Sequence, residues 1–446
     1  MFKMFHYMKE RWYYIVMIVA LLFVQAFCDL SLPDYTSKII NVGIQQKGVE
    51  DGVPETIREE SMDKLLLFLE QEEAEEVLDA YKNKDGIYKL QSVTEEEREE
   101  LNQILGIPEL VVTGLSDEES EETKKIKEQM KLPKEADLFQ VFQSMPKEQL
   151  ETMTEEMKKE LEEMPDSIVT QSAVLFVEQE YEAQDIDMDK LQMEYILMSG
   201  VKMLGLAFLA MAAAIAVTFL SARVAAVLGR NLRNSIYRKV ISFSGRELNQ
   251  FSTASLITRS TNDVQQVQML FTLLFRIVLY APILGIGGVY KVFQTDASMT
   301  WILALAVVVI MLFVVLLFRI AMPKFTRLQF LIDELNLVSR EILTGVPVVR
   351  AFSREKHEEE LFEEANARLT KTNLFVNRCM TFMMPVMMLL MNGVTVLIVW
   401  NGAHAVNEGS MQVGNMMAFM QYAMQIIMAF LMITMMSIMI PRANVA

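Results

Sequence analysis

The sequence predicts an all-α membrane protein that carries a separate, mainly helical acidic insert. Two observations support this class. The chain of 446 residues is 52% hydrophobic and has a positive mean hydropathy, which is too apolar for an ordinary soluble enzyme. Its charge is also divided, because residues 46–195 hold 42 acidic and 16 basic residues, whereas the rest holds 16 acidic and 25 basic. The chain therefore combines a basic membrane part with an acidic insert.

Six apolar stretches are each long enough to cross a bilayer, whose core of roughly 30 Å needs about 20 helical residues. They cover residues 12–30, 195–220, 270–293, 300–321, 381–401 and 413–440. The last stretch exceeds one span, so it is expected to tilt or to project from the membrane before Pro441.

The first stretch has an alternative reading as a secretory signal peptide, because Lys3, Lys9 and Arg11 precede an apolar core. A cleavage site requires small residues, whereas the bulky Phe27 stands directly before Cys28. We therefore expect a retained helix, with an N-terminal region over residues 1–45.

Lys and Arg are concentrated in two connections, at residues 221–270 and 322–378. In contrast, the third connection holds Lys291 alone, and the fifth holds no basic residue. Basic loops face the cytoplasm. The sequence thus predicts a multi-pass protein of the plasma membrane with both termini and both basic connections inside. The insert, residues 46–194, is then expected outside, between the first and second spans; spans two to six lie within 195–446.

Both basic connections are long and their apolar residues recur every three to four positions, which predicts helical hairpins that extend beyond the membrane. We expect the hairpins to turn near residues 243–252 and 331–345. Their tips could be passive scaffolding, or they could bind a cytoplasmic partner.

Two runs within these connections resemble one protein family. FSTASLITRSTND at residues 251–263 resembles the first intracellular loop of ABC exporter transmembrane domains of the type IV fold, and REILTGVPVVRAFSRE at 340–355 resembles the second. The resemblance covers everything except the insert. Ser255 stands where many members have Gly, in a form that is similar to heterodimeric bacterial multidrug exporters.

This resemblance implies a mechanism in which coupling helices, expected at residues 244–252 and 332–344, transmit ATP-driven motion and so switch the spans between inward-open and outward-open states. It implies export of amphipathic or drug-like molecules, with partners that include the lipid bilayer, nucleotide-binding domains and a second, different half-transporter, and no nucleic acid. The residues implied in coupling are Glu247, Asn249, Phe251, Arg259, Asp263, Arg340, Glu341 and Gly345.

No GxxxxGK[ST] phosphate-binding loop occurs in the sequence, so we expect neither ATPase activity nor a cofactor site in this chain. ATP and Mg²⁺ are expected in a nucleotide-binding domain. That domain is either missing by truncation, which we favour because such exporters normally fuse the two parts, or carried by a separate polypeptide. The two cysteines and three histidines show no spacing typical of a metal site.

Polar and flexible residues within the spans are the candidates for a substrate cavity. They are Gln25, Asn392, Gln421, Gln425, Met424 and Met428. The polar side chains could equally bond neighbouring helices, and the methionines could be core or lipid-facing residues.

The insert is expected to be a folded domain with helices at residues 57–82, 95–105, 147–164 and 166–182, and with a capping box between Thr94 and Glu97. Its role could be exit gating, partner contact, cation attraction or only a solvated surface. Its apolar residues suffice for a small core: Leu65, Leu66, Leu69, Val77, Leu78, Leu101, Leu105, Phe139 and Phe142.

Two rival functions remain open at this point. Identical machinery could export peptides or lipids. Alternatively, the chain could be a membrane receptor or scaffold that displays its extracellular domain, a function that does not need the two loop motifs.

Overall fold

The computed structural model describes residues 12–116, 123–124, 127, 138–144, 166–248, 251–295 and 298–445. The chain divides into two compact units, which are described separately. The unit that contains the insert is called the insert unit below, and the other is called the hairpin unit. The insert unit comprises Val16–Phe219 and Trp400–Tyr422; the hairpin unit comprises Met1–Ile15, Leu220–Val399 and Ala423–Ala446.

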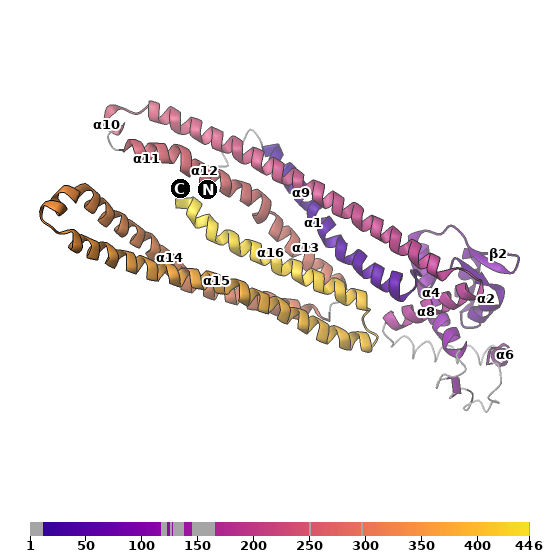
Figure 1. Cartoon of the computed structure of the whole chain (residues 1–446). Coiled ribbons are helices and arrows are strands. Elements are labelled where there is room, and N and C mark those ends of the chain that lie inside the picture. Colours follow the sequence, from indigo (N-terminus) through magenta and orange to yellow (C-terminus); the bar gives the residue numbers. More distant parts are fainter. Residues whose placement is uncertain are drawn as a thin grey trace. The chain divides into compact units, whose positions relative to one another are not determined.

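Six helices of the described residues are long and apolar enough to cross a membrane, which confirms the predicted all-α membrane class (Figure 1). The first is α1, whose last turns continue as the π-helix η2. The third is segmented into α11, η3, α12, η4 and α13, with two π-helical stretches. The spans are α1 (Trp12–Lys38) with η2 (Ile39–Gln45), α9 (Met188–Ile241), Thr253–Thr295, α14 (Thr300–Ala351), α15 (Glu355–Asn407) and α16 (Val413–Val445).

The first hairpin consists of the end of α9, the short helix α10 (Gly245–Leu248), and the segmented third span. That span contains α11 (Thr253–Thr258), η3 (Arg259–Asp263), α12 (Val264–Leu273), η4 (Leu274–Val278) and α13 (Tyr280–Thr295). Gly229 permits a close approach of α9 to α12, because a Cβ there would lie 2.7 Å from Gln268 Oε1. The same oxygen accepts a hydrogen bond of 3.3 Å from the Arg233 guanidinium.

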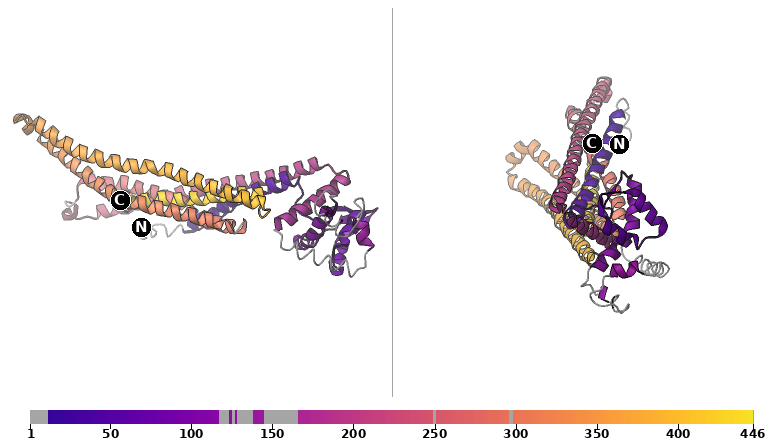
Figure 2. Two further views of the ribbon diagram at one scale, coloured as in Figure 1. Left: turned by 90° about the horizontal axis from the view of Figure 1, so that it is seen from below. Right: turned by 90° about the vertical axis from the view of Figure 1, so that its right-hand side faces the viewer.

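The second hairpin is formed by α14 and α15, which lie side by side (Figures 1 and 2). The expected turn near residues 331–345 is wrong, because α14 continues to Ala351. The helix ends where Ser353 adopts a left-handed φ of 55° and Arg354 N–H donates to the Val349 carbonyl, a bond pattern typical of a helix C-terminus. The separate short helix expected at residues 332–344 is thus part of one long helix.

The insert contains a three-stranded antiparallel sheet that the sequence analysis missed. Its order is β1 (Thr56–Arg58), β3 (Ile87–Leu90), β2 (Tyr81–Lys84). β2 and β3 are joined at Asp85 and Gly86, with φ of 58° and 82°, the geometry that favours Asp-Gly in a tight hairpin. The predicted helix at residues 57–82 is therefore wrong at both ends, and it is also interrupted between α2 and α3.

The helices of the insert are α2 (Glu59–Leu66), α3 (Gln71–Ala80), α4 (Glu95–Ser116), α6 (Leu138–Gln143) and α8 (Asp166–Ala183). The capping box of α4 is confirmed, because Thr94 N–H donates to Glu97 Oε2 at 2.7 Å and Glu97 N–H to Thr94 Oγ1 at 3.3 Å. The helix predicted at residues 147–164 lies outside the described residues.

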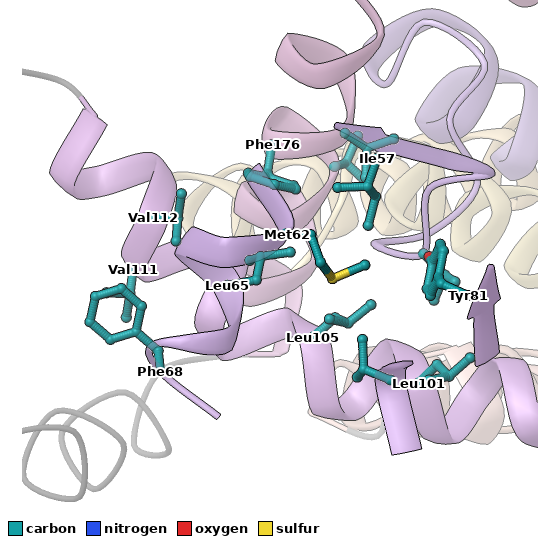
Figure 3. Close-up of a cluster of buried hydrophobic side chains, with 14 of the residues drawn as sticks. Ile57, Met62, Leu65, Phe68, Tyr81, Leu101, Leu105, Val111, Val112 and Phe176 are labelled. Atoms are coloured by element: carbon teal, nitrogen blue, oxygen red, sulfur yellow. The ribbon is translucent and has the colours of Figure 1, made fainter. Parts of the chain in front are cut away.

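These elements enclose one hydrophobic core (Figure 3). Six of the nine predicted core residues are buried, Leu66 and Leu69 pack against the core in partly buried positions, and Leu78 is exposed. Because α4 and α8 pack along one another, the middle and the last parts of the insert are brought together. The insert thus has a core of its own.

Candidate functional site

The tip of the first hairpin is organised by an aromatic pair. Phe243, after α9, and Phe251, before α11, stack with ring centroids 5.8 Å apart and planes 8° from parallel. The Arg259 guanidinium lies 5.3 Å from the centre of the Phe251 ring, close enough for a cation–π contact. The structure thus brings together Phe251 and Arg259, two of the residues implied in coupling. The contacts of Phe251 also hold together the two ends of the segment that contains α10.

Glu247 caps α10. Its carboxylate accepts hydrogen bonds from Ser244 N–H at 2.8 Å and from Ser244 Oγ at 2.9 Å. These bonds favour the ionised form and lower the pKa of Glu247. Glu247 therefore shapes the tip locally, and its exposed position leaves it accessible to a partner. Asp263 lies at the end of η3, and Asn249 lies outside the described residues.

The tip of the second hairpin presents apolar side chains to the exterior. Leu343 and Phe352 are each 75% exposed, and large apolar surface of this kind typically marks an interaction site. Arg340 and Glu341 are also exposed on α14. A Cβ added to Gly345 would meet nothing within 4 Å, so the packing of the hairpin does not require glycine at this position.

A cavity of about 480 Å³ lies at this tip, between the last turns of α14 and the first turns of α15. Apolar side chains form most of its wall, and charged groups are contributed by Arg350 and by acidic residues of α15. The lining residues are Ser339, Ile342, Leu343, Val346, Val349, Arg350, Glu355, Glu358, Glu359 and Phe362. The tip therefore combines an apolar depression with a charged rim, which suits a protein partner.

The predicted substrate residues differ in exposure. In the insert unit, Gln25 and Gln421 are partly buried; in the hairpin unit, Gln425 and Met424 are partly buried, whereas Asn392 and Met428 are exposed. Their joint role in a cavity stays a prediction. The methionines of the fifth span have mixed surroundings: Met383 and Met387 are buried, while Met384 and Met388 are exposed.

Sequence reasoning missed a polar cluster where α1 and η2 meet the start of α16. Ser37 Oγ donates to Asn415 Oδ1 at 2.7 Å, and Asn41 Nδ2 donates to the same oxygen at 3.1 Å. Asn41 Oδ1 accepts from Gly414 N–H at 2.7 Å. We call these four residues the Asn415 cluster. Ser37 and Asn41 lie beyond the first predicted span, residues 12–30, and Asn415 stands at the very start of the last, residues 413–440, so the sequence offers no reason to connect them.

A second polar contact follows along the same two helices. The hydroxyl of the buried Tyr422 donates to the Asp34 carboxylate and contacts the Leu30 carbonyl at 3.1 Å. Asp34 could have been found from the sequence, since an acidic residue next to an apolar span is itself a signal of function.

Residues 174–430, more than half of the chain, match the family described as the ABC transporter transmembrane region. The chain therefore belongs to this family, and it is a multi-pass membrane protein. The match covers the second to fifth spans, the sixth as far as residue 430, and both hairpins, including the two runs that carried the resemblance.

Several ABC transporter proteins are similar to this chain. An uncharacterized ABC transporter ATP-binding protein of Mycobacterium tuberculosis (strain ATCC 25618 / H37Rv) is 38% identical over 246 residues, which cover 55% of this chain and 42% of that protein. A Bacillus subtilis (strain 168) protein of the same description is 32% identical, covering 53% and 41%. An ATP-dependent lipid A-core flippase of Syntrophus aciditrophicus (strain SB) is 26% identical, covering 46% and 34%. The chain thus spans less than half the length of these relatives.

Proposed function

We propose that this chain forms the membrane part of an ATP-driven exporter that moves amphipathic or drug-like molecules outward by alternating access. The observation that carries the proposal is the pair of helical hairpins, each of which ends in an exposed tip. Rigid helices transmit a displacement at the tip to the spans. Family membership supports this role, and the receptor alternative leaves the tips unexplained.

Nucleotide-binding domains are the proposed partners at the tips, and they would supply the ATP and Mg²⁺ chemistry. This chain would contribute two docking surfaces. On the first hairpin, the surface is α10 with the Phe251–Arg259 contact; on the second, it is the exposed side chains of Leu343 and Phe352 with the neighbouring cavity. The names of the relatives support this, since they are called ATP-binding proteins. We further propose a second, different half-transporter as partner.

The distribution of basic residues supports a plasma-membrane orientation with both tips in the cytoplasm and the insert outside. Export of lipids is the second candidate, because one relative is named a lipid flippase. The two candidates differ in cargo and share the proposed coupling.

Substitutions at the second tip test the coupling. The assembled transporter that contains this chain would be reconstituted in vesicles, and ATP-dependent movement of a fluorescent amphiphilic dye and of a fluorescent phospholipid would be measured. Arg340→Ala, Glu341→Lys and Gly345→Leu should each reduce transport at least tenfold, while hydrogen exchange in the insert stays unchanged. Lys371→Ala, on the shaft of the same hairpin, is the matched control and should be active. Full transport in all three tip variants would contradict the proposal.

A further inference from the structure

The Asn415 cluster joins segments that are almost the whole chain apart in sequence. Ser37 and Asn41 are 7% and 5% exposed, so their polar groups are hidden from water. Each finds its partner within the cluster: the Asn415 carbonyl accepts two hydrogen bonds, and the Asn41 carbonyl accepts one from the backbone of α16. The cluster is therefore complete, and its bonds cross between α1 with η2 and the first turn of α16.

The backbone is shaped to permit this contact. A Cβ on Gly414 would lie 2.4 Å from Asn41 Oδ1 and 2.5 Å from the Ser37 carbonyl oxygen. Only glycine allows α16 to approach so closely. On the other side, Asn41 lies within the π-helix η2, a widened helical form that is frequent at functional sites.

The same end of α1 is held to α9 by different means. Gln192 Nε2 donates to the Gly43 carbonyl at 2.7 Å, and a Cβ on Gly43 would lie 2.8 Å from the Ile196 side chain. In addition, Lys47 forms ion pairs with Glu178 and Glu182 of α8, at 3.3 and 3.1 Å. The insert, with its own core, thus joins the end of α1 to the start of α9.

The two contacts of α1, with α16 and with α9, should therefore differ in how easily they open. Hydrogen bonds between neutral side chains contribute little net free energy, because water replaces the partners once the site is wetted. The contact between α1 and α16 can therefore open reversibly at the membrane boundary. The contact between α1 and α9 is supported by the folded insert and is expected to persist.

We propose that the Asn415 cluster is a latch that holds the insert-side ends of the first and last spans together and opens when cargo leaves on that side. The insert would remain with α1 and α9 while the start of α16 moves away. This inference rests on the proposed function, since it assigns a place and a residue set to the outer gate.

Distance measurements between spin labels test the latch in the assembled transporter. One label pair reports on the latch, Ile44 in η2 with Met417 in α16; the other is the matched control, Ile44 with Met193 in α9. All three side chains are exposed. On trapping with ATP and vanadate, the Ile44–Met417 distance should increase by several ångströms, whereas the Ile44–Met193 distance should stay constant.

Weakening the latch should shift the equilibrium between its closed and open forms toward the open form, even in the absence of nucleotide. Asn415→Ala removes two hydrogen bonds, each contributing roughly a fivefold preference for the closed form, so a small open population should rise roughly 25-fold. Ser37→Ala removes one donor and should have a smaller effect in the same direction. Ser410→Ala, whose hydroxyl donates to the Ala405 carbonyl of its own segment at 3.1 Å, is the control and should leave the population unchanged.

The outcomes separate the two proposals. If the transporter hydrolyses ATP and the hairpin tips respond, but the Ile44–Met417 distance is constant in every variant, the latch is wrong. A parallel increase of the Ile44–Met193 distance would also overturn it, because the insert would not keep α1 and α9 together. If neither ATP hydrolysis nor any movement is found in the unmodified transporter, the proposed function itself fails.

Discussion

The insert and the α14–α15 hairpin place their apolar side chains in opposite ways. Ile57 and Leu105 of the insert are completely buried, whereas Leu343 and Phe352 of the hairpin are mostly exposed. A domain gains stability by removing such side chains from water. The insert therefore holds itself together, while the hairpin surface is completed by lipid along its apolar span and, in our proposal, by a protein partner at its tip.

Charged groups show the same contrast. In the insert, Arg58 pairs with the 2% exposed Glu180 at 3.0 Å, and Arg98 pairs with Asp51 at 2.7 Å. In the described part of the hairpin, the ion pair between the helices is Arg368 with Glu334, at 2.8 Å, with side chains 49% and 27% exposed. Polar interactions thus specify the structure of the insert and contribute little to the hairpin.

The largest difference is expected for shortened apolar residues. Leu105→Ala should destabilise the insert by about 2–5 kcal/mol, because it leaves a cavity in a closed core. Leu343→Ala should leave the stability of the hairpin within about 0.5 kcal/mol, because the side chain is exposed. Hydrogen exchange of α4 and α8, and of α14 and α15, in the complete chain would measure both effects. Equal destabilisation by the two substitutions would contradict the comparison.

A buried acid gives the insert a dependence on pH. Glu109 is fully buried and neither carboxylate oxygen has a hydrogen-bond partner within the described residues. Burial, and then the Asp51 carboxylate, raise the pKa of Glu109 well above its usual value. Its protonated form therefore favours folding, and this contribution is fully present below the unfolded pKa of about 4.3 and is lost as pH rises through the raised pKa.

Glu109→Leu should accordingly stabilise the insert by about 1–3 kcal/mol at a pH where Glu109 is ionised, and it should remove the fall in stability that begins above the unfolded pKa. Glu180→Gln is the matched control, because the contribution of Glu180 to stability should depend on pH in the opposite direction. Burial would raise the pKa of Glu180, but hydrogen bonds from Arg58 and Ser61 outweigh it and lower the pKa. Its contribution is present above the unfolded pKa and is lost as pH falls. Thermal unfolding across pH would check both signs, and an unchanged slope for Glu109→Leu would refute the assignment.

Two glycines sharpen the comparison at smaller magnitude. A Cβ on Gly52 of the insert would lie 2.6 Å from Glu109 Oε2 and 2.8 Å from Ala173 Cβ, whereas a Cβ on Gly345 would meet nothing within 4 Å. Gly52→Ala should destabilise the insert by about 1–3 kcal/mol through overpacking. Gly345→Ala should stabilise α14 by about 0.5–1 kcal/mol, because alanine favours helix. The same exchange measurement would show whether the two effects have opposite signs.

The smallest effect is expected for the ion pair of the hairpin. Glu334→Gln should change the stability of α14 and α15 by at most about 1 kcal/mol, since exposed pairs are screened by solvent. A double-substitution cycle with Arg368→Gln would isolate the pair. A coupling energy well above that value would show that polar contacts hold the hairpin after all.

The sequence predicted the features that depend on long apolar periodicity: six spans, two hairpins and the core of the insert. The predictions were wrong where local turn geometry determines the path of the backbone. The Asp85-Gly86 turn was a readable hairpin signal, but the charged residues around it resemble an amphipathic helix. The turn of the second hairpin lies later than the predicted residues 331–345, because α14 continues through Gly345 and Pro347, two residues that usually mark a helix end.

The Asn415 cluster shows why a site can escape sequence analysis. Ser37, Asn41 and Asn415 are ordinary polar residues at the edges of apolar stretches, and nothing in their local sequence indicates that they meet. Their contact depends on the path of the chain through the entire membrane part. The coupling motifs could be found because they are contiguous runs.

The most direct test of the account is hydrogen exchange at the second hairpin tip, residues 340–355, with and without nucleotide-binding domains. We predict that assembly protects this tip, that Leu343→Asp abolishes the protection, and that the exchange of the insert is the same in all samples. If the tip exchanges equally fast with and without nucleotide-binding domains, while both proteins are folded, the hairpin is not a coupling element and the proposed export function is contradicted.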